Sequence, residues 1–585
     1  MKKIVTSLLF LFIGLVLNAQ VIDTARFRLD YVPHILNFQK INQTAKINDT
    51  VQDKVKFDYY ITPQKLNIDF EPSPIKAAKM TPDILERLYR NYVKVGFGFP
   101  ITPLAELSIH NARDKKNSFG LNAHHFSYWA QPIGKVMSQY MYHPFSDTRT
   151  ELYFNHFFRK YTLYTSVGYN HEAVRFYGFH KYNPDYDEND RSKEYLNELK
   201  NNFHHLKAEV GFRSNFTLEE KRLKHDVRVN YDFLRTNHKD MEHHVALNGF
   251  LGYDARFMKI SGSQHYRMDM IFNYINNNWL SDTTRTQDHR FHFELKPTMQ
   301  FTIKEYHIRV GLGIPIIHSQ GKTKVPLYPI AEFQLGVIPG IMNVYAGIDG
   351  KITYNTLSDL LYENPYLKPG LDPLRFTANP IGFNSVYAGI KGNLVKKLNY
   401  HLGARYSRLN DMAFFIIDTT CTLKNQFDIV YYNGGRFNAT LNLNWEVINN
   451  LYLNFEANCW LYHFKDTAAV AWHKPLVNLA FSGKYVLKEK MIFSLNFDMA
   501  FGAKALGRDN IESPWEIQKM KPILDFGIGF EYLIKKNFSA FVTIDNIACQ
   551  HYAKFYNFKS FGINAIVGIT YSFGNESIKK TKTKK

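Results

Sequence analysis

The feature that most constrains the fold is a strict alternation of side-chain type, clearest at the end of the chain in residues 561–573. Successive side chains of a β-strand point to opposite faces, so alternation in sequence becomes a difference between two faces. One face would be apolar and the other small and polar, apart from Ile566. The apolar face holds Ile563, Ala565, Val567, Ile569, Tyr571 and Phe573, and the polar face holds Asn564, Gly568, Thr570 and Ser572.

The same alternation recurs through most of the chain. In residues 91–99, Val93, Val95 and Phe97 alternate with Lys94 and two glycines. In residues 436–447, charged and amide side chains occupy one face and apolar side chains the other. Charges of both signs on one face fit a hydrated lumen opposite lipid, whereas in a soluble sandwich the same split would mean solvent opposite core.

The spacing of the turns separates these two possibilities. Short turns are expected near 112–117, 158–160, 216–221, 302–304, 338–340, 395–397, 448–450, 488–489 and 534–536. Longer connections are expected between them, near 129–147, 178–200, 278–287, 356–382, 466–472, 506–517 and 550–558. Short periplasmic turns that alternate with long extracellular loops are typical of outer-membrane barrels. We therefore predict an all-β fold, a transmembrane antiparallel β-barrel of about 22 strands, with a short periplasmic N-terminal region.

The N-terminus predicts export. Met1, Lys2 and Lys3 precede an apolar run and then Ala19 and Gln20, the pattern of a signal peptide cleaved between those two residues. We expect a signal peptide over 1–19, a periplasmic region over 20–90, a barrel over 91–574 and a basic tail over 575–585. The 20–90 region would either occlude the lumen or form a loosely ordered leader. The expected location is the cell outer membrane.

Composition supports this location and bears on partners. Aromatic residues make up 16% of the chain, which aromatic girdles at the two membrane interfaces would explain. An aromatic-rich soluble β-protein is the alternative. The formal net charge is +19. For an exported barrel, nucleic acid is not expected as a partner. Such a charge suits contact with acidic lipopolysaccharide, or a lumen that favours anions.

Neither an enzyme nor a metal site is predicted. No GxSxG, P-loop or HExxH motif is present. Ser108 and Glu106 share a face with His110, but no third catalytic member is evident. Adjacent histidine pairs at 124–125, 204–205 and 243–244 would point to opposite faces and could not chelate one ion from a single face. Three cysteines argue against a disulfide scaffold, although a Cys421–Cys549 bridge is conceivable. No cofactor is expected.

Several segments resemble a known family. Residues 363–369 (Glu-Asn-Pro-Tyr-Leu-Lys-Pro) resemble the Asn-Pro-x-Leu-x-Pro loop of TonB-dependent receptors. Residues 431–436, which lead into 441–446, resemble the Asn-x-Gly strand of that family, and residues 475–479, 545–547 and 571–573 are similar to its last strands. The resemblance implies a 22-stranded outer-membrane barrel. The family carries a plug of well over a hundred residues, but only about 70 residues precede the first expected strand here. The aromatic richness and the start at Gln20 are similar to plugless, receptor-like barrels of Bacteroidota-type bacteria. No TonB-contact box is evident near 21–27, which leaves TonB open as a partner.

Charged side chains on the polar faces are the candidate functional residues. Their structural role would be cross-strand ion pairing, and their functional role would be the selectivity of a pore. The residues expected to face the lumen are Lys94, Glu106, His110, Lys207, Glu209, Arg213, Asp226, Arg228, Asp232, Arg436, Glu446, Glu456 and Asp498. The connection over 356–382 is the best candidate for a loop that folds into the mouth.

The leading hypothesis is an outer-membrane channel or transporter that moves or binds solutes. A barrel this wide needs its lumen occluded by the 20–90 region, by inward loops or by an envelope protein partner. The alternative is a non-transport barrel that acts as a scaffold subunit of an envelope secretion or assembly complex. A barrel enzyme with a rim triad is the third hypothesis and the least supported.

Overall fold

The structure is a computed structural model that describes residues 89–111, 114–129, 144–178, 199–215, 223–256, 264–281, 284–370, 383–395, 397–508, 512–560 and 562–575. The chain divides into two units, Met1–Asp83 and Ile84–Lys585, and every described residue belongs to the second. The predicted signal peptide with its Ala19–Gln20 cleavage site, nearly all of the 20–90 region and nearly all of the basic tail lie outside the described residues.

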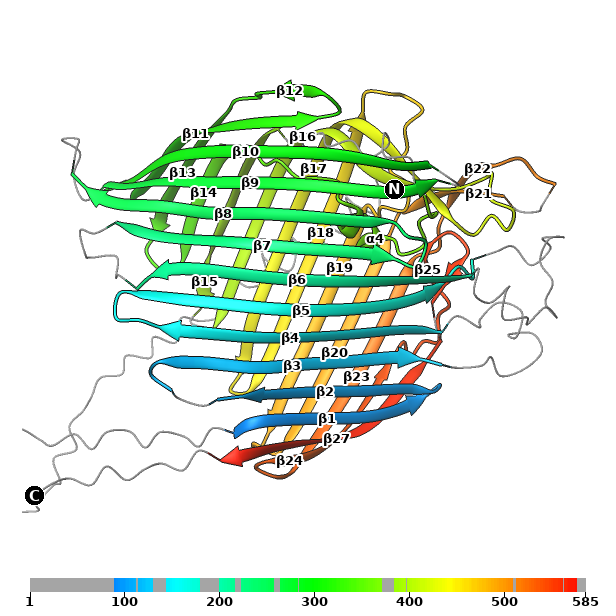
Figure 1. The fold of residues 1–585 in the computed structure, drawn as a ribbon. Coiled ribbons are helices and arrows are strands. Elements are labelled where there is room, and N and C mark those ends of the chain that lie inside the picture. Colours follow the sequence, from blue (N-terminus) through cyan, green and yellow to red (C-terminus); the bar gives the residue numbers. More distant parts are fainter. Residues whose placement is uncertain are drawn as a thin grey trace, which may run out of the picture. The chain divides into compact units, whose positions relative to one another are not determined.

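The described chain is almost entirely antiparallel β-structure (Figure 1). The strands of the main sheet are β1 (Tyr89–Phe99), β2 (Thr102–His110), β3 (Asn117–Tyr128), β4 (Phe145–Phe157), β5 (Tyr161–Arg175), β6 (Lys200–Ser214), β7 (Lys224–Thr236), β8 (Met241–Ala255), β9 (Gln264–Ser281), β10 (Thr284–Ile303), β11 (Tyr306–Ser319), β12 (Lys322–Lys324), β13 (Tyr328–Ile338), β14 (Met342–Asp349), β15 (Phe383–Val395), β16 (Leu398–Ile417), β17 (Phe427–Ile448), β18 (Leu451–Phe464), β19 (Val477–Leu487), β20 (Met491–Phe501), β23 (Ile523–Lys535), β24 (Phe538–Asp545) and β27 (Asn564–Asn575).

The sheet closes on itself because the first strand pairs with the last. Each strand pairs with its neighbours in the chain, and β1 pairs antiparallel with both β2 and β27. The short β12 pairs only with the end of β11, and β11 also pairs with β13. Setting β12 aside leaves a closed barrel of 22 strands. This confirms the fold class and the strand number that the alternation predicted.

The two ends of the barrel differ as the turn spacing predicted. At the turn end the strands are joined by tight links, such as 449–450 between β17 and β18. At the loop end lie the long connections, including those that follow β5, β14 and β24. One expected long connection, 278–287, is wrong. Its polar sequence, rich in threonine with Ser281 and Asp282, reads as a loop, but β9 and β10 stay paired across it up to the Ser281–Thr284 pair. The barrel also begins at Tyr89, two residues before the expected start, and its last strand ends at Asn575.

Alternation decides which side chains face outward. In β27, Val567 is 62% exposed and Ile569 is 49% exposed, whereas Ile566 and Thr570 on the other face are buried. The predicted difference between the two faces of this strand is therefore present. Such an exposed apolar surface is stable only where lipid or another apolar medium covers it.

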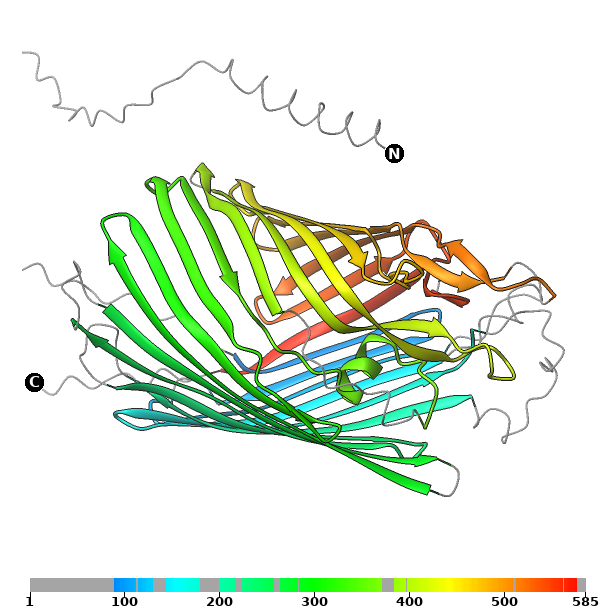
Figure 2. The ribbon, with the colours of Figure 1, turned by 90° about the horizontal axis from the view of Figure 1, so that it is seen from above.

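The buried core lies mainly at the loop end, inside the barrel. It includes one side of the helix α4 (Leu357–Glu363) and residues of two small hairpins, β21 (Lys504–Gly507) with β22 (Glu516–Lys519), and β25 (Ala553–Phe555) with β26 (Phe558–Lys559). Figure 2 shows α4 between two walls of strands. Within the described residues, no helix is long and apolar enough to cross a membrane.

Candidate functional site: a loop-closed lumenal chamber

The site begins with the closing loop, defined here as residues 350–370 between β14 and β15. Thr356 caps its helix α4, because the threonine side chain accepts a hydrogen bond from the Asp359 backbone N–H at 2.9 Å. Leu357, Leu360 and Leu361 share one buried side of the helix. The loop therefore presents a compact apolar surface to its surroundings.

That apolar surface packs against both walls of the barrel. One wall contributes Val174, Phe203, Leu234 and Trp279 from β5, β6, β7 and β9. The other wall contributes Ala413, Phe415, Ile417, Phe427 and Ile429 from β16 and β17. Burying one leucine side chain contributes about 1.5–3 kcal/mol, so the three leucines of α4 hold the loop firmly. The closing loop thus spans the lumen, which confirms the expectation of a loop folded into the mouth.

A buried polar cluster holds the start of the helix. The Glu242 carboxylate on β8 accepts hydrogen bonds from the backbone N–H groups of Leu357 at 2.6 Å and Ser358 at 3.1 Å. Arg290 on β10, whose side chain is fully buried, donates to the Asn355 carbonyl at 3.1 Å. An anion at a helix N-terminus is stabilising, since the first N–H groups of the helix have no partner within it.

The end of the loop pairs with the opposite wall. Leu367 forms a parallel bridge with Phe427, and the Lys368 backbone N–H donates to the Phe427 carbonyl at 3.0 Å. The Lys368 ammonium contacts Asp428 at 2.8 Å and Asp418 at 3.3 Å. Polar contacts at both ends of the loop therefore supplement the apolar core.

Other loop-end segments pack on top of the closing loop. The ring of Tyr366 stacks on Phe558 with 3.8 Å between centroids. His473 joins three segments: its Nδ1 lies 2.9 Å from the Phe415 carbonyl, and its Nε2 accepts from the Tyr556 backbone N–H at 3.2 Å. Burial lowers the pKa of His473 to about 4, so the ring is neutral at neutral pH. The described mouth is a single packed unit.

Asp240, in the turn between β7 and β8, lies beside the last residue of the closing loop. Its carboxylate accepts a hydrogen bond from the Gly370 backbone N–H at 3.4 Å. Burial raises the pKa of Asp240 to about 6, although that hydrogen bond acts in the opposite direction. A carboxyl group with a raised pKa therefore lies at this end of the loop.

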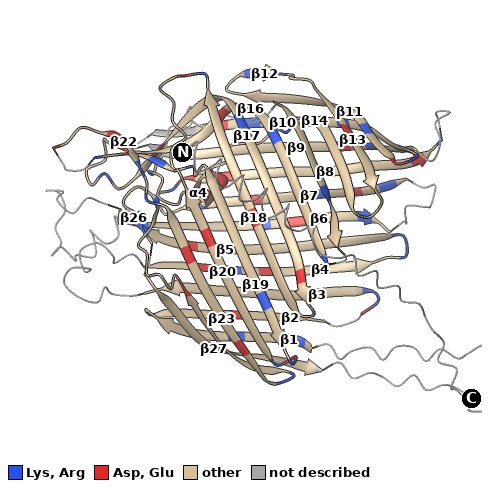
Figure 3. Ribbon diagram, turned by 180° about the vertical axis from the view of Figure 1, so that it is seen from behind, with Lys and Arg blue, Asp and Glu red and all other residues tan. Residues whose placement is uncertain are grey.

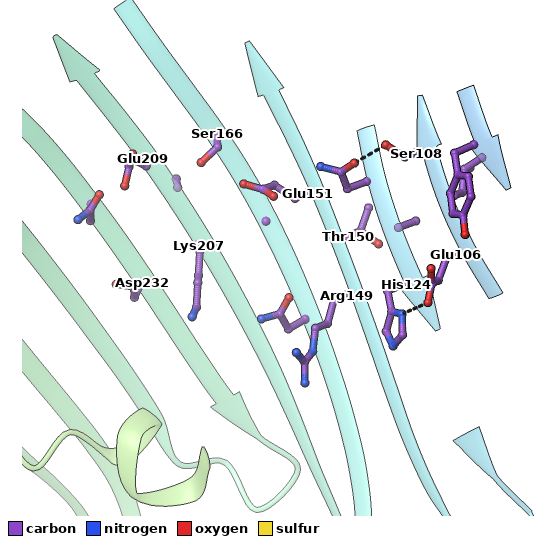
Figure 4. A pocket seen from close by; sticks show the side chains of 18 residues that line it. Glu106, Ser108, His124, Arg149, Thr150, Glu151, Ser166, Lys207, Glu209 and Asp232 are labelled. Carbon is purple, nitrogen blue, oxygen red and sulfur yellow. Dashed lines mark hydrogen bonds and ion pairs between the residues drawn. The ribbon is translucent and has the colours of Figure 1, made fainter. Parts of the chain in front are cut away.

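Beneath the loop is a polar cavity in the wall formed by β1–β7, which we call the lumenal chamber (Figure 4). Its volume is about 680 Å³, and a neighbouring space of about 420 Å³ extends it to Ser358, Asp359 and Tyr362 of α4. Arg149 and Lys207 line both spaces. The chamber and the closing loop are thus continuous.

Acidic groups outnumber basic ones in the chamber. The acidic lining residues are Glu106, Asp147, Glu151, Glu172, Glu209, Asp232 and Asp359, and the only lysine or arginine side chains among the described lining residues are Arg149 and Lys207. Lys94 offsets Glu106 at 3.4 Å, and Arg149 offsets Asp147 at 2.6 Å. Glu151 and Glu209 have no ion pair among the described residues. The chamber therefore does not fit a lumen that favours anions.

The structure brings some of the thirteen candidate residues together. Glu106, Lys207, Glu209 and Asp232 line the chamber, with Lys94 beside them. A second group lies nearer the turn end, where Asp226 contacts Arg213 at 2.9 Å and Arg228 at 3.6 Å. The Asp226–Arg213 contact joins β7 to β6 and fits the structural role of cross-strand ion pairing, whereas Arg228 contacts Asp226 within β7.

The other candidates lie elsewhere. Glu446 contacts Lys397 at 2.9 Å at the turn end, and Glu456 accepts from Asn458 at 2.7 Å. The remaining three are Arg436 on β17, Asp498 on β20 and His110 at the end of β2, and none lines the chamber. Figure 3 shows that acidic and basic residues lie along the strands as well as in the loops.

Sequence reasoning missed several residues of the site. Arg149 and Glu151 alternate with Thr150 and Leu152 in β4, so the period-two pattern could have found them. Glu242 and Arg290 carried no such signal, because their partners in the closing loop are distant in sequence.

The cysteines and the adjacent histidines form neither a disulfide nor a metal-binding group within the described residues. All three cysteines are free, so Cys421 and Cys549 do not form the bridge considered above. The described residues contain no group of three or more His, Cys, Asp or Glu that could hold a metal ion. The histidine pairs do point to opposite faces: in the pair at 204–205, His204 hydrogen-bonds Tyr169 and His205 lines the chamber.

The sequence matches no known protein family and no curated protein. The fold, however, matches solved structures. The pyoverdine outer-membrane receptor FpvA from Pseudomonas aeruginosa PAO1 superimposes with a TM-score of 0.62 at 11% identity, over 84% of this chain and 79% of that one. The siderophore receptor PirA from Acinetobacter baumannii gives a TM-score of 0.62 at 10% identity, over 84% and 81%.

A third match is a mutant form of the ferric enterobactin receptor PfeA from Pseudomonas aeruginosa. It has a TM-score of 0.56 at 10% identity, over 83% of this chain and 80% of that one. At such low identity the likeness concerns the fold alone. The chain thus has the fold of the large outer-membrane receptor barrels, as the sequence motifs implied.

Proposed function

We propose that this protein is a receptor-type transport barrel of the outer membrane, whose lumen is closed on the loop side by its own closing loop. The observation that carries the proposal is the course of residues 350–370, which pack against β5–β9 on one wall and β16–β17 on the other. A barrel of 22 strands is wide enough for a lumen that must be blocked to preserve the membrane barrier. A loop that is held across the lumen by non-covalent contacts with both walls is a suitable gate.

The lumenal chamber supports the transport role. It lies directly beneath α4 and is lined by hydrogen-bonding and charged side chains, as expected of a space that receives a hydrated solute. Its acidic excess would favour cationic over anionic solutes that pass the loop. The likeness to siderophore receptors supports receptor-type transport and does not identify a solute for this chain.

The test is single-channel conductance of purified protein in planar bilayers. Three proteins are compared: the full chain, a Glu242→Ala variant that weakens the loop, and a chain lacking 21–88. Insertion is verified for each. A silent full chain with long-lived openings in Glu242→Ala would support closure by the loop. Openings only after removal of 21–88 would assign closure to that region.

If all three are folded and inserted but silent, the transport proposal fails. The scaffold role in an envelope complex then becomes the better explanation, and partner purification is the next step.

A further inference from the structure

A repeated tyrosine–histidine pair occurs in three strand pairs on one side of the barrel. In each, the tyrosine hydroxyl lies within hydrogen-bond distance of histidine Nδ1 on the next strand. The pairs are Tyr169–His204 at 2.8 Å across β5–β6, Tyr231–His243 at 2.9 Å across β7–β8, and Tyr274–His289 at 2.9 Å across β9–β10. The two rings of each pair also stack.

These pairs lie on the outer surface. His205 and Lys207 of β6 line the chamber. Their neighbours in the strand, His204 and Leu206, therefore point outward. The same alternation places His243 and His289 outward, since the adjacent Glu242 and Arg290 contact the closing loop inside.

The pairs mark the border of the apolar surface on the loop side. Toward the turn end, the outward residues of β6 include Leu206, Val210 and Phe212, all exposed. Toward the loop end, the outward residue Lys200 begins the same strand. The pairs therefore occupy the level at which the lipid-facing band gives way to polar surface.

Basic groups surround the first pair. His171 lies beside His204, with 4.8 Å between ring centroids, and Arg235 is directly opposite His204 in the register of β6 and β7. In the described strands β5–β10, no Asp or Glu occupies an outward position. We call this surface the histidine patch: His171, Lys200, His204, Arg235, His243 and His289 with the three partner tyrosines.

The tyrosines set the chemistry of the histidines. A hydroxyl that donates to Nδ1 of a neutral imidazole leaves the proton on Nε2, so that each ring keeps an N–H donor. Of the three donors, the one on His204 lies beside Arg235, whereas those on His243 and His289 lie two and four strands further along the wall, roughly 10 and 19 Å away at the usual strand spacing. With no outward carboxylate in the described strands β5–β10, this row of donors suits several oxyanion groups of one molecule. The phosphate groups of a lipid at the membrane surface have that chemistry.

We propose that the histidine patch binds the phosphate groups of an acidic lipid in the outer leaflet. The inference concerns the outer wall and not the lumen, and it rests on the outer-membrane location proposed above. A lipid held there would fix the depth and the rotation of β5–β10 in the membrane.

The experiment is native mass spectrometry of the full chain titrated with lipid A that carries phosphates, and with the same lipid after the phosphates are removed. The test variant combines His204→Gln, His243→Gln and His289→Gln. The matched control is His463→Gln, because His463 is an exposed, outward-facing histidine near the loop end of β18. A second variant, with phenylalanine in place of Tyr169, Tyr231 and Tyr274, removes only the hydroxyls.

We expect the native chain to prefer the phosphorylated lipid, and the triple glutamine variant to lose at least about tenfold in affinity. The phenylalanine variant should lose about two- to fivefold, because the imidazoles lose their orientation, and His463→Gln should bind as the native chain does. Equal affinity for the two lipids overturns the proposal, as does an equal loss in the control. Failure of the native chain to insert into bilayers would instead refute the location.

Discussion

Replacing Glu242 by alanine tests the central claim that the closing loop is held in the mouth by a buried carboxylate. The change removes the acceptor for the Leu357 and Ser358 backbone N–H groups and leaves the buried Arg290 with Asp288, 3.1 Å away, as its remaining carboxylate within the described residues. Removing one partner of a buried charged cluster costs about 3–5 kcal/mol. At about 1.4 kcal/mol per factor of ten, the open state should gain between about a hundredfold and a few thousandfold.

The assay is hydrogen exchange of the peptide that covers α4, measured by mass spectrometry. We expect its exchange to accelerate by that factor in Glu242→Ala, while the barrel strands keep their protection. Glu242→Gln should give a smaller effect, about ten- to a hundredfold, because the amide oxygen still accepts one hydrogen bond. Glu456→Ala is the matched control, since Glu456 is a lumenal candidate that does not contact the loop. Unchanged protection of α4 in a correctly folded Glu242→Ala protein would refute the reasoning.

Three further predictions concern other parts of the site. Because burial raises the pKa of Asp240 from its ordinary 3.8 to about 6, its ionisation disfavours the docked loop. The protonated Asp240 carboxyl therefore contributes fully to loop docking below about pH 4, and this contribution is lost as pH rises through about 6. Hydrogen exchange in residues 364–370, corrected for the intrinsic rate, should rise across this pH range. Asp240→Asn should remove that rise. In Gly211→Ala the new Cβ would clash with the ring of Tyr164, which should lower the free energy of unfolding by about 1–3 kcal/mol and lower the unfolding midpoint on heated gels. Gly168→Ala is the control: the nearest atom to a Cβ there lies 3.6 Å away, so the midpoint should not change. Once the loop is released, replacing Glu151 and Glu209 by glutamine should shift the reversal potential in a salt gradient toward less cation preference; an unchanged potential would show that the chamber does not set selectivity.

Much of the fold could be predicted because the two faces of a strand can be assigned from the alternation of neighbouring residues in its sequence. The alternation in 561–573 and 436–447 needed only the two-residue period of a strand, and tight turns such as 449–450 divided the chain into segments. The error at 278–287 had the opposite cause. The serine, aspartate and threonine residues there resemble a loop in composition, but pairing between β9 and β10 continues up to Ser281 and Thr284. Composition cannot show where pairing ends when strands extend beyond the lipid.

The site was less predictable, for reasons that particular residues make clear. Lys207 and Glu209 could be assigned to a polar face, yet nothing local showed that Arg149, two strands away, shares their cavity. The closing loop was recognisable as a long connection with an Asn-Pro motif. Its position against Trp279 and Phe415 depends on closure of the barrel.

The sequence by itself determined the direction of each side chain along a strand, and with it the apolar outside, the polar inside and the number of strands, because those properties depend on near neighbours in the chain. Only the tertiary structure decided which inward groups meet. Glu242 reaches Leu357 across 115 residues of sequence, and Tyr169 reaches His204 only through the register of β5 and β6. Contacts of this kind depend on strand register and on how a long loop packs in the lumen, and a local pattern records neither.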